Sequence, residues 1–366
     1  MDPERFFDEF DARDWERAQA GTVRVAMIGV GWWVTDFAIP AVESIDNCET
    51  TVLVSSDKAK AERVADDCDA EAGITYDEFH DGVAADAYDA VYICTPNALH
   101  LPYVETAADL GKAVLCEKPM EASVERAEDL VEAATDVPLM VAYRMHTEPG
   151  VRQMRAALQE GLVGDPVFVH GHNSQRLLEM IPDPDQWRLD PDLAGEGGSV
   201  TDIGIYPLNT ARFVLGRDPV SAQAAMHSES EGFQSIPDER AGFQLTFEDG
   251  VYAACTTSQN AYGSGHLRVV GTEGELVFDP AYGMSDDRSL TLRRGGTSVD
   301  VRFDHVDQMA EEFAYFADHV LTGEPIHADG EHGLVDMRAI EAIYESARSG
   351  EEVDISTRTR RAAGTH

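Results

Sequence analysis

Apolar runs alternate with amphipathic stretches along the first 146 residues of the chain. Short apolar runs bounded by turn residues are typical of buried strands, and they occur at residues 23–30, 49–55, near Ile74, 90–95, 113–119 and 138–144. Apolar residues at helical spacing predict helices between them, at residues 34–45, 57–68, 77–84, 101–111 and 123–135. Regular alternation of strand and helix predicts an α/β domain built on a doubly wound parallel sheet.

The pattern changes after about residue 147. A predicted helix at 149–160 leads into PVFVHGHN, and strand-like runs then follow one another between residues 219 and 303. Gly, Asp and Ser turns separate these runs, which read VSAQAAMH, AGFQLTF, VYAACTTS, HLRVVGT, GELVFD, LTLRR and SVDVRF. No long helix interrupts them, so this part predicts an α+β domain with a large, open and mostly antiparallel sheet. Two predicted helices follow, at about 306–321 and 332–348.

These patterns divide the chain into four parts. Residues 22–146 form the doubly wound domain, residues 147–355 form a second α/β domain, and residues 356–366 are expected to be a frayed tail. Residues 1–21 carry Phe6, Phe7, Phe10 and Trp15 at roughly helical spacing among charged residues. This spacing predicts an amphipathic N-terminal arm.

The net charge of −40 is spread over nearly every segment of the chain. Nucleic acids and anionic membranes bind basic faces, so we expect neither as a partner. Only four of the 28 basic residues are lysines, and an evenly acidic surface is typical of a salt-saturated cytoplasm. No apolar run approaches the ~18 residues of a membrane span and the acidic N-terminus does not resemble a signal peptide, so we expect a cytoplasmic, halophilic protein. The five cysteines are scattered without a CxxC pair, so we expect no metal site or disulfide framework.

The stretch GVGWWV follows the first predicted strand and is typical of a nucleotide-binding loop. Gly29 and Gly31 stand where the turn must be tight and where the backbone must approach a pyrophosphate. Val34 occupies the place of the usual third glycine and would push the following helix slightly away from the strand. Trp32 and Trp33 are interpreted as packing or a lid where the loop passes the dinucleotide. The alternative is an ordinary strand, turn and helix.

The second strand ends in LVSSDKAK, where an acidic residue usually holds the ribose 2′-hydroxyl of NAD. Ser55, Ser56, Lys58 and Lys60 offer hydroxyl and ammonium groups instead, and these groups suit a 2′-phosphate. NADP is therefore favoured, with NAD as a weaker alternative. The alternative for the segment itself is a solvated helix N-terminus with Asp57 as its cap.

Three further motifs carry candidate chemistry. CTPNALH (94–100) and CEKP (116–119) follow the next two strands, at the sheet edge where ligands bind in such folds. Lys118, beside Glu117, is a candidate charge near a reacting oxygen, or alternatively part of a surface ion pair. In VTDIGIYPLN (200–209), Asp202 and Tyr206 are four residues apart and share a helix face. A tyrosine beside a lysine can accept a proton from an alcohol, although a lone tyrosine is more often a packed aromatic residue.

The motifs GVG, CTPN, EKP, AYR and DIGIY, in this order, resemble the Gfo/Idh/MocA family of NAD(P)-dependent sugar oxidoreductases. The resemblance covers residues 22–355 and is strongest to the glucose–fructose oxidoreductase branch, some members of which also lack the third glycine. It implies a Rossmann domain followed by an α/β domain whose open sheet often forms the subunit interface. We therefore expect a homo-oligomer, either a dimer or a tetramer, that contacts its neighbours through the second sheet.

The resemblance also implies roles for individual residues. Lys118, Tyr206 and Asp202 correspond to the catalytic lysine, the base and the substrate-binding aspartate. Arg144, Trp187 and Arg188 match positions near both the cofactor and the sugar. Together with the motifs above, it gives these expected cofactor contacts: Gly29, Gly31, Trp32, Trp33, Ser55, Ser56, Lys60, Thr95, Pro96, Asn97, His100, Glu117, Lys118, Arg144, Trp187 and Arg188.

The implied activity is NADP-dependent oxidation of an aldopyranose at C1 to the aldonolactone, with D-xylose as the favoured substrate. Hydride passes to NADP while Tyr206 takes the C1 hydroxyl proton, Lys118 stabilises the developing alkoxide and Asp202 orients the sugar. Two alternatives stay open. One is an enzyme that never releases NADP and reduces a second sugar, and the other is a sensor that binds NADP and sugar without hydride transfer.

Overall fold

The computed structural model describes residues 3–15, 21–284, 287–303 and 305–355, which divide into two compact units. The Rossmann unit comprises Arg13–Glu148 and Val306–Leu334. The sheet unit comprises the chain up to Ala12, Pro149–His305 and the chain from Val335 onward. The predicted frayed tail at 356–366 lies outside the described residues.

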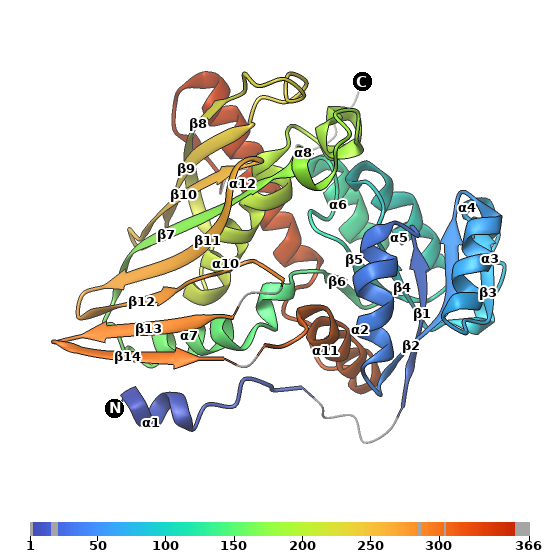
Figure 1. Cartoon of the computed structure of the whole chain (residues 1–366), viewed down its shortest axis with the longest axis horizontal. Coiled ribbons are helices and arrows are strands. Elements are labelled where there is room, and N and C mark those ends of the chain that lie inside the picture. Colours follow the sequence, from blue (N-terminus) through green and yellow to red (C-terminus); the bar gives the residue numbers. More distant parts are fainter. Residues whose placement is uncertain (1–2, 16–20, 285–286, 304, 356–366) are drawn as a thin grey trace. The chain divides into compact units, whose positions relative to one another are not determined.

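A parallel six-stranded sheet forms the centre of the Rossmann unit (Figure 1). Its strands lie in the order β3-β2-β1-β4-β5-β6, and this order reverses direction between β1 and β4, as in dinucleotide-binding sheets. Every residue of β4, β5 and β6 is buried, which explains why these strands read as continuous apolar runs. The doubly wound parallel fold is confirmed. The strands are β1 (Val23–Ile28), β2 (Cys48–Ser55), β3 (Ala72–Thr75), β4 (Ala90–Ile93), β5 (Ala113–Cys116) and β6 (Leu139–Val141).

The helices of the Rossmann unit follow the predicted alternation with two differences. The helix predicted at 34–45 begins with a π turn, Val34–Ala38, before it continues as α2. The helix α11 packs against β1, β2 and α2, with Phe313 and Phe316 fully buried, whereas the division drawn along the sequence placed this segment in the second domain. The helices are α2 (Ile39–Glu43), α3 (Lys58–Asp67), α4 (Tyr76–His80), α5 (His100–Asp109), α6 (Val124–Ala133) and α11 (Gln308–Thr322). Short 3₁₀ turns lie at Ala85–Ala87, Asn97–Leu99 and Arg144–His146.

A nine-stranded sheet forms the centre of the sheet unit, in the order β14-β13-β12-β11-β7-β10-β9-β8-β15. Neighbouring strands run antiparallel except β7 and β10, which pair in parallel, so the expectation of a mostly antiparallel sheet is confirmed. The short edge strand β15 was not predicted. The strands are β7 (Pro166–Arg176), β8 (Pro219–His227), β9 (Arg240–Phe247), β10 (Tyr252–Ser258), β11 (Asn260–Gly271), β12 (Gly274–Phe278), β13 (Ser289–Arg294), β14 (Thr297–Arg302) and β15 (Val353–Asp354).

Helices cover one face of this sheet (Figure 1). α7 contacts β12 and β13, and α10 contacts β7 and β10. A Cβ atom on Gly171 of β7 would lie 2.6 Å from the Cβ of Pro207, so the glycine lets α10 approach the strand closely. This approach fixes the helix that carries Tyr206 and the π turn before it, Val200–Gly204, that carries Asp202. The helices and remaining turn are α7 (Pro149–Gln159), α8 (Leu177–Met180), the 3₁₀ turn Trp187–Leu189, α9 (Pro191–Ala194), α10 (Ile205–Leu215) and α12 (Gly330–Ser349).

The predicted amphipathic arm is helical only over α1 (Pro3–Asp8) within the described residues 3–15. In the sheet unit, Phe7 is buried and its carbonyl oxygen accepts a hydrogen bond from Gln153 Nε2 at 3.0 Å. In the Rossmann unit, Arg13 pairs with Glu311, and Trp15 packs edge-on against Tyr315 with 5.6 Å between ring centroids. These residues of the arm therefore pack on the chain's own surface. No helix among the described residues combines the length and apolarity needed to cross a bilayer.

Candidate active site

The glycine loop after β1 has the geometry that its sequence predicts. Gly29 has a φ of +95°, and a Cβ atom there would lie 2.3 Å from the carbonyl oxygen of Cys94, so only glycine fits. At Gly31 a Cβ atom would meet no described atom within 4 Å, which leaves the backbone bare beside the loop. Val34 is fully buried and begins the π turn, so a packed valine side chain occupies the place of the third glycine. The loop therefore keeps the two features that an approaching pyrophosphate requires.

Some polar side chains after β2 are hydrogen-bonded within the protein, and others are accessible to a ligand. Asp57 caps α3 by accepting a hydrogen bond from the backbone N–H of Lys60 at 3.1 Å, and Ser55 Oγ accepts one from the N–H of Asp57. The ammonium group of Lys58 bonds the carboxylate of Glu78 at 2.7 Å. Ser56 is exposed and Lys60 is half-buried. Ser56 and the side chain of Lys60 are therefore the groups best placed for a 2′-phosphate, and Lys58 is already paired.

A hydrogen-bonded chain links the glycine loop to the EKP motif inside the Rossmann unit. Trp33 Nε1 donates to Tyr92 Oη at 3.2 Å, and Tyr92 Oη donates to Glu117 Oε1 at 2.7 Å. The other carboxylate oxygen of Glu117 accepts a hydrogen bond from the backbone N–H of Lys118 at 3.1 Å. Burial raises the pKa of Tyr92 well above its usual value, so the phenol keeps the proton that it donates. This chain fixes the backbone of Lys118 and gives Trp33 a positioning role.

Tyr92 belongs to none of the motifs that point to the site. Its one signal in the sequence is a hydroxyl inside the otherwise aliphatic strand AVYI. Trp32 is 42% exposed and meets Trp33 edge-on, with 5.6 Å between ring centroids. Phe37 completes the aromatic group, with its ring centroid 4.9 Å from that of Trp33. The exposed ring of Trp32 is therefore the one that can cover a ligand at this loop.

The CTPNALH loop contributes two notable side chains, the hydroxyl of Thr95 and the buried imidazole of His100. Thr95 is buried, and its Oγ1 has no hydrogen-bond partner among the described residues. Both ring nitrogens of the fully buried His100 lie beside backbone carbonyls, Nδ1 at 3.1 Å from Met120 O and Nε2 at 3.0 Å from Thr95 O. This geometry does not support the predicted cofactor contact of His100, because the ring is enclosed and joins the loop to the EKP segment. Asn97 in the same loop is also buried, and Pro96 precedes it.

Helix α11 adds polar groups to this side of the Rossmann unit. Arg144 is buried and donates from Nη1 to Gln308 Oε1, and Gln308 Nε2 donates to Glu148 Oε2. One turn later on α11, both carboxylate oxygens of the buried Glu312 lack a hydrogen-bond partner among the described residues. Burial raises the pKa of Glu312 well above its usual value, Glu117 raises this pKa further, and Arg144 and Lys118 oppose the shift. Gln308 and Glu312 carry no signal in the sequence that links them to Arg144, because they lie more than 160 residues beyond it.

The sheet unit holds the other predicted residues. Asp202 Oδ2 accepts a hydrogen bond from Gln259 Nε2 at 2.7 Å and lies 3.7 Å from Arg188 Nε. The guanidinium of Arg188 stacks over the ring of Trp187 at 4.5 Å. Tyr206 lies in the first turn of α10, half-buried, with its ring centroid 5.8 Å from that of Tyr282. The four residues Trp187, Arg188, Asp202 and Tyr206 therefore all belong to the sheet unit.

A buried carboxylate anchors the segment that enters this helix. Asp238 accepts hydrogen bonds at 2.7 Å from the backbone N–H groups of Gly198 and Val200 and from Tyr344 Oη. Burial raises the pKa of Asp238, and these hydrogen bonds oppose the shift. A Cβ atom on Gly197 would lie 2.3 Å from Asp238 Oδ1, which explains the glycines of GEGGSVTD. Asp238 thereby holds the backbone directly before Asp202.

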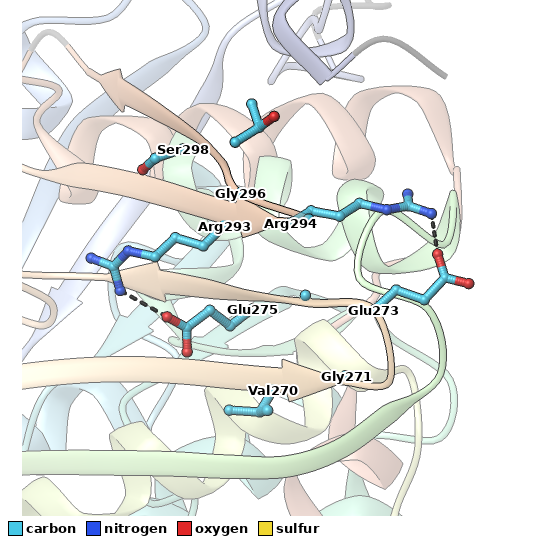
Figure 2. A pocket seen from close by; sticks show the side chains of 11 residues that line it. Val270, Gly271, Glu273, Glu275, Arg293, Arg294, Gly296 and Ser298 are labelled. Carbon is cyan, nitrogen blue, oxygen red and sulfur yellow. Dashed lines mark hydrogen bonds and ion pairs between the residues drawn. The ribbon is translucent and has the colours of Figure 1, made fainter.

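A hollow of about 510 Å³ lies at the turns between β11 and β12 and between β13 and β14 (Figure 2). Its two arginines are already paired, Arg294 with Glu273 and Arg293 with Glu275. None of the predicted site residues is among those that line it. The charges of this hollow are satisfied within the protein, so we assign it no ligand. The described residues also contain no cluster of His, Cys, Asp and Glu suited to a metal ion.

Comparison with known proteins identifies both parts of the chain. A model of an oxidoreductase family with an NAD-binding Rossmann fold matches residues 23–144, and the GFO/IDH/MocA C-terminal domain matches residues 151–277. The chain belongs to the Gfo/Idh/MocA family of oxidoreductases.

Three relatives refine this placement. The chain is 57% identical over 345 residues to D-xylose 1-dehydrogenase (NADP(+)) of Haloarcula marismortui, which covers 93% of this chain and 96% of that protein. It is 36% identical over 324 residues to D-xylose 1-dehydrogenase (NADP(+)) 2 of Haloferax volcanii, across 87% of this chain and 95% of that protein. A crystal structure of aldose-aldose oxidoreductase from Caulobacter crescentus complexed with glycerol has a TM-score of 0.85 and 29% identity, and covers 91% of this chain and 99% of that chain. The Gfo/Idh/MocA resemblance that the motifs indicate is therefore confirmed, and two of these relatives are NADP-dependent D-xylose 1-dehydrogenases.

Proposed function

We propose that this protein is an NADP-dependent aldose 1-dehydrogenase that oxidises an aldopyranose, with D-xylose as its preferred substrate, to the aldonolactone. The observation that carries the proposal is the presence of Lys118, Asp202 and Tyr206 in a chain 57% identical to a D-xylose 1-dehydrogenase. The first of these residues is held by Glu117 and the second by Gln259. A sensor would not need all three groups. The relatives do not favour that alternative, nor the enzyme that retains its NADP.

The residues of the Rossmann unit fit a dinucleotide. Where the strand order reverses, the loop after β1 has a bare backbone at Gly31. The loop after β4 has a buried hydroxyl at Thr95 that lacks a hydrogen-bond partner among the described residues. Ser56 and Lys60 supply a hydroxyl and an ammonium group at the end of β2. When bound, NADP would supply the hydride acceptor.

The protein's own residues would transfer the proton, stabilise the developing charge and orient the sugar. Tyr206 takes the proton of the C1 hydroxyl as the C1–H bond breaks. The Lys118 ammonium group stabilises the negative charge that develops on that oxygen. Asp202 accepts a hydrogen bond from a sugar hydroxyl, and a carboxylate held in one orientation by Gln259 suits this task. The proton leaves to solvent as the lactone forms.

Turnover is expected to require added NADP. Protein freed of nucleotide, mixed with D-xylose and NADP, should form one NADPH for each lactone. NADPH absorbance and chromatography of the lactone measure the two products. Turnover of two sugars without added NADP would instead identify the alternative enzyme that retains its cofactor.

Ser56→Asp is expected to lower the preference for NADP over NAD by about tenfold or more, because the new carboxylate would repel a 2′-phosphate. The ratio of kcat/KM values with NADP and with NAD measures this preference. Lys58→Ala is the matched control, since Lys58 is already paired with Glu78 and its loss should leave the ratio unchanged. An unchanged ratio in Ser56→Asp would place the 2′-phosphate elsewhere.

We further propose that the protein works in a salt-saturated cytoplasm. The support is its net charge of −40, spread along the chain, and the haloarchaeal source of two relatives. The thermal unfolding midpoint is therefore expected to rise between low-salt buffer and molar KCl, since salt screens the repulsion between acidic groups. A midpoint that stays constant or falls would contradict this adaptation.

We also propose that the open face of the nine-stranded sheet binds a second copy of the chain. Phe168 and Tyr252 are 45% and 41% exposed and are register partners on β7 and β10, while Val169 and Ala253 beside them are fully buried. The exposed residues of the described strands β7, β9 and β10 include no acidic side chain, in a chain with 68 acidic residues. A nearly acid-free patch with two large exposed rings is suited to self-association.

Phe168→Glu is expected to shift the protein from oligomer towards monomer in molar KCl, because it places a carboxylate within the proposed interface. Sedimentation velocity measures the mass. Met180→Glu is the matched control, since Met180 is 56% exposed but lies on α8 rather than on the sheet. An unchanged mass for Phe168→Glu would move the interface to another surface.

A further inference from the structure

Gln259 is a buried amide that no motif predicts. It lies between β10 and β11 and is fully buried. Its backbone N–H donates to Glu239 O and to Ser199 Oγ, each at 3.0 Å, and its carbonyl oxygen accepts from Leu177 N at 2.8 Å. Three hydrogen bonds therefore fix the main chain of Gln259, independently of the contacts of its side chain.

The side-chain amide of Gln259 joins two partners in a defined direction. Its Nε2 donates to Asp202 Oδ2 at 2.7 Å, and its Oε1 accepts from Gln175 Nε2 at 2.8 Å. An ionised carboxylate only accepts hydrogen bonds, so the amino group of Gln259 must point to Asp202. Its carbonyl oxygen must then point to Gln175, which supplies the matching donor. Hydrogen bonds aligned in this way polarise one another, so the bond to Asp202 is strengthened.

Three other groups lie near Asp202 or hold its backbone. Arg188 stands 3.7 Å from the same oxygen, Oδ2, which is beyond hydrogen-bond distance. From β7, the neutral Asn173 donates to the carbonyl of Ile203, and from β10, Thr257 donates to the carbonyl of Ser199. These contacts hold the backbone on either side of Asp202, whereas Gln259 holds the carboxylate itself.

We propose that Gln259 is a positioning residue for the reaction, which holds the Asp202 carboxylate oriented towards the sugar through the chain Gln175, Gln259, Asp202. This inference rests on the proposed function, because it assigns sugar binding to Asp202. It predicts that Gln259 acts more on sugar affinity than on cofactor affinity, since most of the expected cofactor contacts, including the glycine loop and the end of β2, belong to the Rossmann unit. Arg188, 3.7 Å from Asp202, is an expected cofactor contact within the sheet unit.

Gln259→Glu tests the proposal with little change in side-chain volume. A second carboxyl group opposes ionisation of Asp202 and cannot donate to it when ionised. We expect KM for the wild type's best aldose to rise about tenfold or more, with the Kd for NADP, from fluorescence titration, within about twofold of wild type. The acid limb of the kcat/KM profile should also move to higher pH, a change that simple loss of stability would not cause.

Two further variants complete the test. Gln175→Leu removes the donor behind Gln259 and should raise KM in the same direction by a smaller factor. Gln159→Glu adds the same negative charge at an exposed position of α7 and should leave KM and the pH profile unchanged. If wild type turns over an aldose and Gln259→Glu keeps its KM and pH profile, the positioning role is overturned and the dehydrogenase function stands. If wild type turns over no aldose, the proposed function fails and this inference fails with it.

Discussion

Tyr206→Phe is expected to lower kcat for aldose oxidation by about 10²–10⁴, the usual cost of removing a general acid–base group. The phenol oxygen is the proposed acceptor of the C1 hydroxyl proton, and phenylalanine keeps the ring but not the acceptor. The ring of Tyr206 packs beside that of Tyr282, and this contact survives the change, so the fold should be retained. Initial rates at saturating sugar and NADP measure kcat, and the thermal midpoint checks folding.

Tyr262→Phe is the matched control for this experiment. It removes the same hydroxyl group from a tyrosine that is 78% exposed on β11, and turnover should stay at the wild-type level. Near-normal kcat in Tyr206→Phe would remove Tyr206 from the chemistry and leave it as a packed aromatic residue.

Lys118→Ala is expected to lower kcat by a similar factor of about 10²–10⁴, because the developing charge on the reacting oxygen loses its positive partner. The backbone of Lys118 is held through its own N–H by Glu117, so this anchor does not depend on the side chain that is removed. Lys112→Ala is the control for lost positive charge in the same unit. Its ammonium group bonds the carbonyl of Tyr88 at 2.9 Å, and its loss should affect stability more than kcat.

The double variant of Tyr206→Phe and Lys118→Ala sharpens the assignment. When two residues act together on one reacting oxygen, the losses of kcat caused by their single substitutions do not add up in the double variant. We therefore expect the double variant to be little slower than the slower single variant. A loss equal to the product of the two single losses would mean that the two residues act in independent steps.

The parts of the fold that could be predicted are those that a short stretch of sequence determines by itself. β4 and β5 are buried along their whole length, so their apolar runs identify them without knowledge of their neighbours. Gly29 and Lys118 follow strand ends directly, and the doubly wound pattern places such positions at one edge of the sheet. The roles expected of the EKP and DIGIY motifs come instead from the resemblance to the Gfo/Idh/MocA family, which these motifs carry.

The parts that could not be predicted depend on contacts between distant segments. Gln259 is 57 residues from the aspartate that it orients, and Asp238 is 40 residues from the Gly198 N–H that it accepts from. Gln308 of α11 is 164 residues from Arg144. A lone glutamine or aspartate carries no periodic signal, so its role emerges only when the sheet and helices bring the segments together.

Local geometry also departed from the sequence pattern in ways with a physical cause. A spacing of 3.6 residues predicts ordinary helices at 34–45 and around 200–209, but both begin with a π turn, a form that is frequent at functional sites. The ammonium group of Lys58, which the sequence offers to a 2′-phosphate, is paired with Glu78. The ring of His100, an expected cofactor contact, lies between two backbone carbonyls. In each case a neighbouring group engages a side chain that the sequence presents as available.

The central claim is that this chain oxidises an aldose at C1 with NADP, and an initial-rate panel tests it most directly. Pentoses and hexoses are each supplied with NADP and with NAD in molar KCl, and NADPH or NADH formation is followed. We expect the highest kcat/KM for D-xylose with NADP. The kcat/KM for glucose should be lower by a factor that corresponds to ~1–3 kcal/mol of transition-state binding, the discrimination that one CH₂OH group allows. Failure to reduce NADP with every aldose in the panel, by protein shown to be folded, would contradict it.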